Sequence, residues 1–227
     1  SEMILITGGC GYIGSHVAAE LINQNYEIII IDNLANSSKL VISRLEKITN
    51  KKILFFRGDL TDRNFVENIF KTYNIKSVFH FAGLKSIKQS IIEPSKYFLN
   101  NVTSSRNLID TMIKYGVNEI IFSSSATVYD CSNEVPWTEN SSIDDKKHPY
   151  GNTKKEEEIM LKQISSKNTN WKVAILRYFN PVGAHKSADL GEFSILNSTN
   201  LVPKICTTIL GITEFVPIYG NDFKTHD

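Results

Sequence analysis

Six short apolar runs recur along the chain, and they limit its possible folds more than any other feature. Each run is continuously apolar rather than alternating, which is typical of strands buried on both faces of a parallel sheet. Stretches with helical periodicity separate the runs and predict β-α-β crossovers. We therefore predict an α/β fold with a doubly wound parallel sheet and helices on both faces. The predicted strands are 3–7, 27–32, 52–57, 77–82, 118–124 and 172–177, and the predicted helices are 12–24, 37–49, 62–74, 93–115 and 150–166.

The β-α-β pattern loosens after Asn180. Turn-forming residues such as Pro181 and Gly183 predict a long loop over 181–199. A helix at 200–211 and a short strand at 215–218 are expected to follow. Nothing in this part of the sequence has the pattern of a finished domain.

The composition excludes several classes of protein. Lys and Arg (25) nearly balance Asp and Glu (24), so no overall charge favours nucleic acid or a membrane surface. Cys10, Cys131 and Cys206 are odd in number and widely spaced, which favours reduced thiols and predicts no metal site. No stretch resembles a signal peptide or reaches membrane-spanning length. We expect a cytoplasmic protein.

A glycine-rich segment follows the first predicted strand and opens the first predicted helix. Gly8, Gly11 and Gly14 have G-x-x-G-x-x-G spacing, one residue longer than the common dinucleotide fingerprint. Glycines let the backbone approach a pyrophosphate, and a helix N-terminus offers free N–H groups to it. A glycine-rich turn with no ligand is the simpler reading, but the strand-loop-helix order favours dinucleotide binding. We predict a Rossmann-like NAD-binding domain over 1–180.

An acid at the end of the second predicted strand indicates which dinucleotide binds. Asp32 lies 18 residues beyond Gly14, where a carboxylate accepts both ribose hydroxyls of NAD and repels the 2′-phosphate of NADP. A turn or helix-capping aspartate is the alternative, and the neighbouring Asn33 suits that purpose too. Asp59, after the third strand, is a candidate for the adenine amino group, with capping again the alternative. These residues favour NAD as the cofactor.

Tyr150 and Lys154 lie four residues apart, just after Pro149, which is tolerated in the first turn of a helix. Side chains at this spacing share one helical face. A lysine cation beside a phenol favours the phenolate, so the pair suits a general base. The spacing also occurs by chance on solvated helix faces, and the rest of the chain must decide between these readings.

Several motifs, taken in order, resemble the extended short-chain dehydrogenase/reductase family over essentially the whole chain. More narrowly, the chain resembles the enzymes in that family that interconvert UDP-glucose and UDP-galactose. The resemblance implies an NAD-dependent isomerase that inverts C4 of a UDP-hexose through a transient 4-keto sugar. It also implies a homodimer through helices 93–115 and 150–166. The motifs are residues 7–16 (TGGCGYIGSH), 81–85 (FAGLK), 100–102 (NNV), 123–129 (SSSATVY), 149–154 (PYGNTK) and 177–181 (RYFNP).

The resemblance assigns roles to individual residues. It implies that Tyr150 is the base, that Lys154 assists it and holds the nicotinamide ribose, and that Ser125 hydrogen-bonds the sugar 4-oxygen. The implied cofactor-binding residues are Gly8, Gly11, Tyr12, Ile13, Gly14, Asp32, Asn33, Asp59, Leu60, Phe81, Ala82, Gly83, Lys85, Asn101, Ser123, Tyr150, Lys154 and Tyr178. The implied substrate-binding residues are Lys85, Ser125, Tyr150, Asn180, Asn200 and Leu201.

Simpler roles stay open for several of these residues. Lys85 is alternatively a solvated loop lysine, and Asn101 a helix-surface amide. Ser123 alternatively serves only packing. Asn200 is alternatively a helix N-cap, a role compatible with ligand binding.

The end of the chain departs from the family pattern. Residues 219–223 (YGNDF) resemble the start of a segment that leads, in the family, to a substrate-binding domain. We therefore expect 181–227 to be an incomplete substrate-binding region and the chain to be truncated. On this reading the chain alone binds NAD weakly and has little activity, because closure of the site normally contributes much of the rate.

Other functions share this fold. A nucleotide-sugar 4,6-dehydratase needs an acid pair after the serine, and Ala126-Thr127 follows Ser125 instead. A nucleotide-sugar decarboxylase or a different 4-epimerase stays open. So does a non-catalytic NAD-binding module, although that role does not require Ser125, Tyr150 and Lys154 together.

Overall fold

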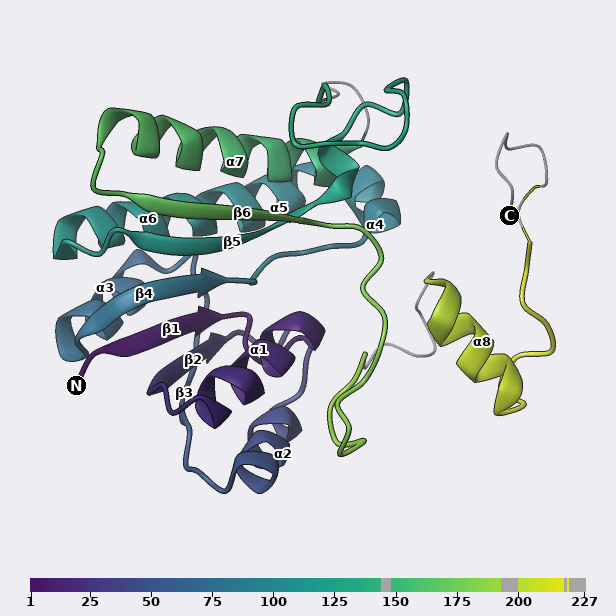
Figure 1. The fold of residues 1–227 in the computed structure, drawn as a ribbon, viewed down its shortest axis with the longest axis horizontal. Coiled ribbons are helices and arrows are strands. Elements are labelled where there is room, and N and C mark those ends of the chain that lie inside the picture. The colour runs from purple at the N-terminus through teal and green to yellow at the C-terminus, as the bar shows by residue number, and fades with distance from the viewer. Residues whose placement is uncertain (144–147, 193–199, 219, 221–227) are drawn as a thin grey trace.

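The computed structural model describes residues 1–143, 148–192, 200–218 and 220. Six strands form one parallel sheet in the order β3-β2-β1-β4-β5-β6 (Figure 1). In this order the sheet is wound outward in both directions from β1 and β4, as in dinucleotide-binding folds. The predicted fold class and all six predicted strands inside the sheet are confirmed. The strands are β1 (Met3–Thr7), β2 (Ile28–Asp32), β3 (Leu54–Arg57), β4 (Ile75–His80), β5 (Glu119–Ser125) and β6 (Lys172–Tyr178).

Several of the helices begin where the sequence carries start signals. Asp62 caps α3 by accepting a hydrogen bond from Phe65 N at 3.1 Å, and prolines occupy the first positions of α5 and α7. The longer helices are α1 (Tyr12–Asn23), α2 (Leu40–Thr49), α3 (Arg63–Thr72), α6 (Ser104–Tyr115) and α7 (Pro149–Lys167). The shorter elements are α4 (Ile87–Ile92), α5 (Pro94–Phe98), a π-helical turn (Leu99–Thr103), a 3-10 turn (Ala126–Val128) and α8 (Leu201–Ile209).

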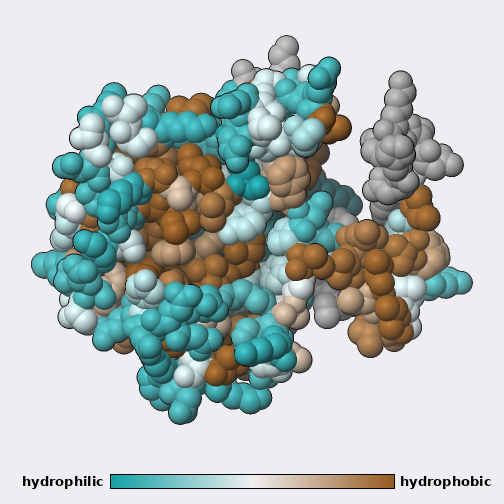
Figure 2. Space-filling model, in the orientation of Figure 1, coloured by the Kyte–Doolittle hydropathy of each residue, from teal (hydrophilic) through white to brown (hydrophobic). Residues whose placement is uncertain are grey.

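Helices cover both faces of the sheet, but unequally. One core cluster joins the sheet to α3, α6 and α7, and a second joins it to α1 and α2. Over β5 and β6, on the face that carries α1 and α2, the sheet is partly open, and Leu176 is 40% exposed. Figure 2 shows apolar surface there, in the centre of the view. No helix in the described part of the chain is long and apolar enough to cross a membrane.

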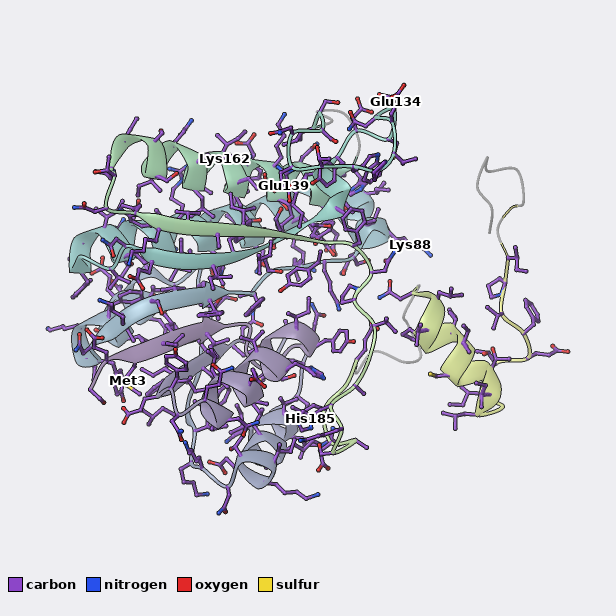
Figure 3. The ribbon with its side chains drawn as sticks, viewed as in Figure 1. Met3, Lys88, Glu134, Glu139, Lys162 and His185 are labelled. Atoms are coloured by element: carbon purple, nitrogen blue, oxygen red, sulfur yellow. The ribbon has the colours of Figure 1, made fainter. Side chains whose placement is uncertain are left out.

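The chain after β6 returns to the first two helices. Tyr12 Oη donates a hydrogen bond to the carbonyl of Gly183 at 2.6 Å, and Lys47 pairs with Asp189 at 3.0 Å. Leu190 is buried in the cluster with α1 and α2. Figure 3 shows His185 on this returning segment, beyond which α8 lies past the carboxyl ends of the strands.

Two sequence expectations need correction. Residues 215–218 form no strand, and Phe215 and Ile218 are exposed, because this segment pairs with no strand among the described residues. The predicted helix 93–115 is interrupted by the π-helical turn, and α4 was not predicted. Part of the predicted loop, 193–199, lies outside the described residues.

We expect Asp62→Ala to lower the free energy of unfolding by about 1 kcal/mol, because the first turn of α3 loses its side-chain acceptor. Asp62→Asn keeps an acceptor oxygen and should cost clearly less. Urea unfolding of the two variants and the wild type measures this difference. Equal losses in both variants would contradict the capping role.

Candidate active site

The predicted site residues gather where the six strands end. Parallel pairing places all carboxyl ends at one edge of the sheet, which is where ligands bind in open α/β folds. Hydrogen bonds tie the segments that leave this edge: Gly8 N donates to Ile31 O at 2.8 Å, and Phe81 N donates to Thr7 O at 3.0 Å. Figure 1 shows β4, β1 and β2 ending on the same side.

The glycine-rich loop forms a tight cradle between β1 and α1. Gly8 has a φ of +69°, and a Cβ there would lie 2.6 Å from Ala82 N. A Cβ on Gly14 would lie 2.3 Å from Gly8 O, so the helix meets the loop backbone closely. Gly11 begins α1 without a side-chain cap, which leaves helix N–H groups for an anion. These features fit the pyrophosphate of a dinucleotide.

Asp32 lies at the end of β2 and is almost fully buried. One carboxylate oxygen accepts a hydrogen bond from Cys10 N at 3.0 Å, inside the glycine-rich loop. The other accepts from Leu34 N at 2.8 Å and Ser37 Oγ at 2.9 Å. The carboxylate thus orders both the loop and the turn after β2, a role that the sequence left as an alternative to ribose binding.

A hydrogen bond links the side chains of Asp59 and Asn33. Asn33 Nδ2 donates to one Asp59 oxygen at 2.9 Å, and Thr61 donates its backbone N–H and hydroxyl to the other. Burial raises the pKa of Asp59, but these hydrogen bonds outweigh it and lower the pKa below its usual value. Asp59 therefore closes its own turn, and the capping alternative is wrong for it, because Asp62 caps α3. Leu60 beside it is buried.

Tyr150 and Lys154 lie in the first turns of α7. His148 caps this helix by accepting from Gly151 N at 3.0 Å, and its ring stacks on Tyr150 with the planes 7° apart. Lys154 is only 5% exposed, and its ammonium lies over the Phe122 ring at 4.7 Å from the centroid. The solvated helix face that the spacing also allowed is therefore wrong for Lys154.

Ser125 ends β5 and is buried. Its hydroxyl oxygen accepts from Thr127 N at 3.2 Å and from Thr127 Oγ1 at 2.9 Å. A Cβ on Gly151 would lie 3.0 Å from Thr127 O, so the first turn of α7 packs on the turn after Ser125. The structure thereby brings the Tyr150 turn beside the Ser125 turn.

Asn101 is buried inside the π-helical turn and is not a surface amide. Its side chain accepts from Leu84 N at 2.8 Å and donates to Leu84 O at 3.0 Å and Thr153 Oγ1 at 3.1 Å. This clamp fixes the segment after β4 against α7, where a Cβ on Gly83 would lie 3.6 Å from Lys154 Nζ. Lys85 follows in an exposed position.

The remaining predicted residues are less enclosed. Tyr178 ends β6, and burial raises the pKa of its hydroxyl, whereas Asn180 is exposed. Asn200 occupies the N-cap position of α8, yet its amide donates to Glu192 Oε1 at 2.9 Å rather than capping the helix. Leu201 is 64% exposed. Tyr178 lies opposite Ser125 in the pairing of β5 with β6, and the ligand roles of all these residues stay predictions.

Sequence reasoning missed a buried ionic cluster behind Ser124. Glu158 on α7 accepts from Ser124 Oγ at 2.6 Å and from Arg177 Nε at 2.9 Å and Nη2 at 2.7 Å. Burial raises the pKa of this carboxyl, but the hydrogen bonds from Arg177 and Ser124 outweigh it and lower the pKa. Lys162, which Figure 3 labels on α7, pairs with Glu158 Oε2 at 3.1 Å. Only the i,i+4 spacing of Glu158 and Lys162 was visible in the sequence.

A second missed group is His80 at the end of β4. It is 1% exposed, and its ring nitrogens lie 2.6 Å from Thr7 Oγ1 and 2.7 Å from Ser105 Oγ. Burial and the nearby Lys154 charge lower the pKa of His80 to about 3. The ring is therefore neutral at physiological pH, and both nitrogens have hydroxyl partners.

We expect His80 to make the folded chain sensitive to acid. An unfolded histidine takes up a proton near pH 6.5, whereas the folded one stays neutral to about pH 3, so stability falls as the pH falls between these values. From about pH 7.5 to about pH 5, the wild type should lose about 2 kcal/mol more than His80→Asn. Denaturant unfolding at the two pH values measures both losses, and equal losses would contradict a neutral, buried His80.

Comparison with known proteins agrees with this geometry. Residues 4–209 match the model of the NAD dependent epimerase/dehydratase family. The chain is 45% identical over 224 residues to UDP-glucose 4-epimerase of Neisseria gonorrhoeae and 44% identical to that of Bacillus subtilis (strain 168). These alignments cover 99% of this chain and 66% of each relative. The chain thus spans just under two thirds of the length of these relatives.

Two solved structures share the fold over 99% of this chain. UDP-glucose 4-epimerase from Bifidobacterium longum, in complex with NAD+ and UDP, is 40% identical with a TM-score of 0.92, and 67% of its length is covered. The enzyme from Stenotrophomonas maltophila, with bound NAD and formylated UDP-arabinopyranose, is 39% identical with a TM-score of 0.95, and 66% of its length is covered. The resemblance drawn from the motifs is confirmed, and the chain belongs to the NAD dependent epimerase/dehydratase family.

Proposed function

We propose that this chain carries the cofactor-binding and catalytic half of an NAD-dependent isomerase that interconverts UDP-glucose and UDP-galactose at C4. The observation that carries the proposal is the arrangement at the carboxyl edge of the sheet. There the glycine cradle opens on one side of β4, and the turns that bear Ser125 and Tyr150 pack together on the other. The relatives described above are named for this reaction.

NAD fits the residues that surround the cradle. Gly8, Gly11 and Gly14 would hold its pyrophosphate against the start of α1, and Asp32 would face the adenosine ribose. Lys154, next to Gly83, would hold the nicotinamide ribose. When bound, NAD accepts a hydride from C4 of the sugar and later returns it. The protein contributes position and proton transfer.

Three side chains would take part in proton transfer at the sugar 4-oxygen. Tyr150 would accept the proton of the 4-hydroxyl and return it after the transient 4-keto sugar has turned over. Lys154 places a positive charge in the same wall of the site, one helical turn beyond Tyr150. Ser125 would hydrogen-bond the 4-oxygen and relay its proton, since its hydroxyl oxygen already accepts from Thr127 and keeps its own hydrogen to donate.

A 4,6-dehydratase is the competing enzyme with the same fold. Elimination across C5–C6 needs acidic side chains just after the serine. In this chain that position holds Ala126 and Thr127, and the Thr127 hydroxyl donates to Ser125. This contact favours a relay serine over an acid pair and so supports epimerisation.

Residues 1–180 would form the NAD-binding domain, and 181–227 would belong to the region that binds the nucleotide-sugar. Asn180, Asn200 and Leu201 would contact the UDP-sugar, as would Lys85 from the exposed loop after β4. A cytoplasmic setting is part of the proposal, because the three cysteines are odd in number and widely spaced in the sequence, which favours reduced thiols.

We expect Tyr150→Phe in the full-length protein to lower turnover of UDP-galactose by about a hundredfold or more, because the base is lost. NAD binding should remain, since the ring and the cradle are kept. Tyr26→Phe alters an exposed tyrosine and serves as the control. A coupled assay for UDP-glucose measures turnover, and unchanged turnover in Tyr150→Phe would contradict the mechanism.

We further propose a homodimer through the helices α5, α6 and α7. A surface hollow between α5 and α7 is lined by Pro94, Phe98, Pro149 and Asn152. Phe98 is 54% exposed and the adjacent Leu99 is 62% exposed, so neighbouring large apolar side chains are available for a contact at this hollow. A second copy packed here would form a four-helix contact and cover them.

Phe98→Asp should shift the protein from dimer to monomer, because it places a charge in the apolar contact. Lys71→Gln, at an exposed position of α3, lowers the charge by the same one unit and is the control. Sedimentation velocity at micromolar concentration reports the mass of each variant. A dimer that persists in Phe98→Asp, or a wild type that is already monomeric, would contradict this interface.

A further inference from the structure

Lys154 has a buried acidic neighbour one turn along α7. Glu157 is fully buried, and its Oε2 lies 3.2 Å from Lys154 Nζ. Its other oxygen accepts a hydrogen bond from Ser105, and His80 Nε2 lies 3.9 Å from that oxygen. The mechanism above gives Glu157 no role. Burying a carboxylate lowers the stability of the fold unless its partners compensate, so the partners of Glu157 need an explanation.

Glu157 differs from its neighbour Glu158 in the partners of its carboxylate oxygens. Glu158 divides its two oxygens among Ser124, Arg177 and Lys162. Glu157 Oε2 has no hydrogen-bond partner of good geometry in the described structure, and its ion-pair distance to Lys154 is its only close polar contact there. This oxygen therefore acts on one group, the ammonium of Lys154.

The Lys154 ammonium is held on several sides. Phe122 lies beneath it, and Gly83 lies beside it, so that a Cβ there would be 3.6 Å from Nζ, in ordinary van der Waals contact. A lysine has a flexible four-carbon stem, so these apolar walls do not fix the position of the charge by themselves. Glu157 supplies the directional attraction. Burial raises the pKa of Glu157, so its carboxylate form depends in turn on the Lys154 charge beside it.

A line of buried hydrogen bonds anchors Glu157 to the cofactor loop. Thr7, which directly precedes Gly8, contacts His80, and His80 contacts Ser105. Since His80 is neutral, one consistent order has the Thr7 hydroxyl donating to Nδ1 and Nε2–H donating to Ser105, which donates to Glu157. In this order every donor meets an acceptor and the last group is a carboxylate. The glycine cradle and Lys154 are thus parts of one buried unit.

We propose that Glu157 is a positioning residue, which holds the Lys154 ammonium where it meets the nicotinamide ribose and so tightens NAD binding. This inference rests on the proposed function, because it takes the ligand of Lys154 to be NAD. Glu157 itself would touch neither NAD nor the sugar. A purely structural Glu157 is the alternative, in which its loss weakens the fold regardless of Lys154.

A double-mutant cycle on NAD affinity separates these two roles. The variants are Glu157→Gln, Lys154→Met and the double variant, each in the full-length protein freed of nucleotide, with NAD as the titrant followed by calorimetry. Glu157→Gln keeps the shape and the acceptor for Ser105 but removes the charge. It should weaken NAD binding about tenfold or more, since hydrogen bonds and pairs that involve charges have this magnitude. In the Lys154→Met background the same substitution should change the affinity less than about twofold.

Glu119→Gln is the matched control. Glu119 pairs with Lys172 at 2.8 Å, in an exposed ion pair at the amino end of β5. Its loss should leave NAD affinity unchanged. Glu157→Asp keeps the charge at shorter reach and should restore part of the affinity lost in Glu157→Gln.

Each outcome supports or overturns the inference. Equal losses from Glu157→Gln with and without Lys154, or no loss at all, would overturn it while leaving the proposed function intact. If the wild type itself fails to bind NAD, the proposed function fails, and this inference fails with it. If Glu157→Gln does not fold, Ser105→Ala replaces it, because that change removes the donor to Glu157 and keeps both charges. Ser105→Ala must then weaken NAD binding only when Lys154 is present.

Discussion

The parallel pairing of six strands is the constraint from which the site follows. Because every strand runs in one direction, the loops after β1, β2, β4 and β5 all leave the sheet at the same edge. The close approach of Gly8 to Ala82 depends on β1 and β4 being neighbours, and the pairing of Ser125 with Tyr178 depends on β5 and β6. The reversal of winding between β1 and β4 leaves the cradle open at this edge.

Helix α7 begins at this edge of the sheet, and it buries several charged side chains. Its inner face carries Lys154, Glu157 and Glu158, where an ordinary helix of this fold carries apolar residues. Taking these groups out of water is unfavourable unless each finds partners. Glu158 accepts hydrogen bonds from Arg177 and Ser124, whereas Glu157 accepts one from Ser105 and its other oxygen lies 3.2 Å from Lys154 Nζ. In the proposed mechanism these buried charges hold the Lys154 ammonium in a fixed place.

The sequence predicted the parts of the molecule that depend on local patterns. Continuous apolar runs located the strands, and Asp62 and Pro149 marked helix starts. It could not predict features set by contacts between distant residues, such as the π-helical turn that buries Asn101 or the neutral state of His80. The failed strand at 215–218 has the same origin, because a strand needs a partner that the local sequence does not describe.

The most direct test of the account follows the hydrogen at C4 of the sugar. UDP-glucose labelled with deuterium at C4 is incubated with the full-length protein, and the UDP-galactose formed is analysed by mass spectrometry and NMR. The account predicts that the product keeps its deuterium at C4, because the hydride leaves and returns within one closed site while Tyr150 moves only the hydroxyl proton. Exchange of the label with solvent, or no conversion at all, would contradict it.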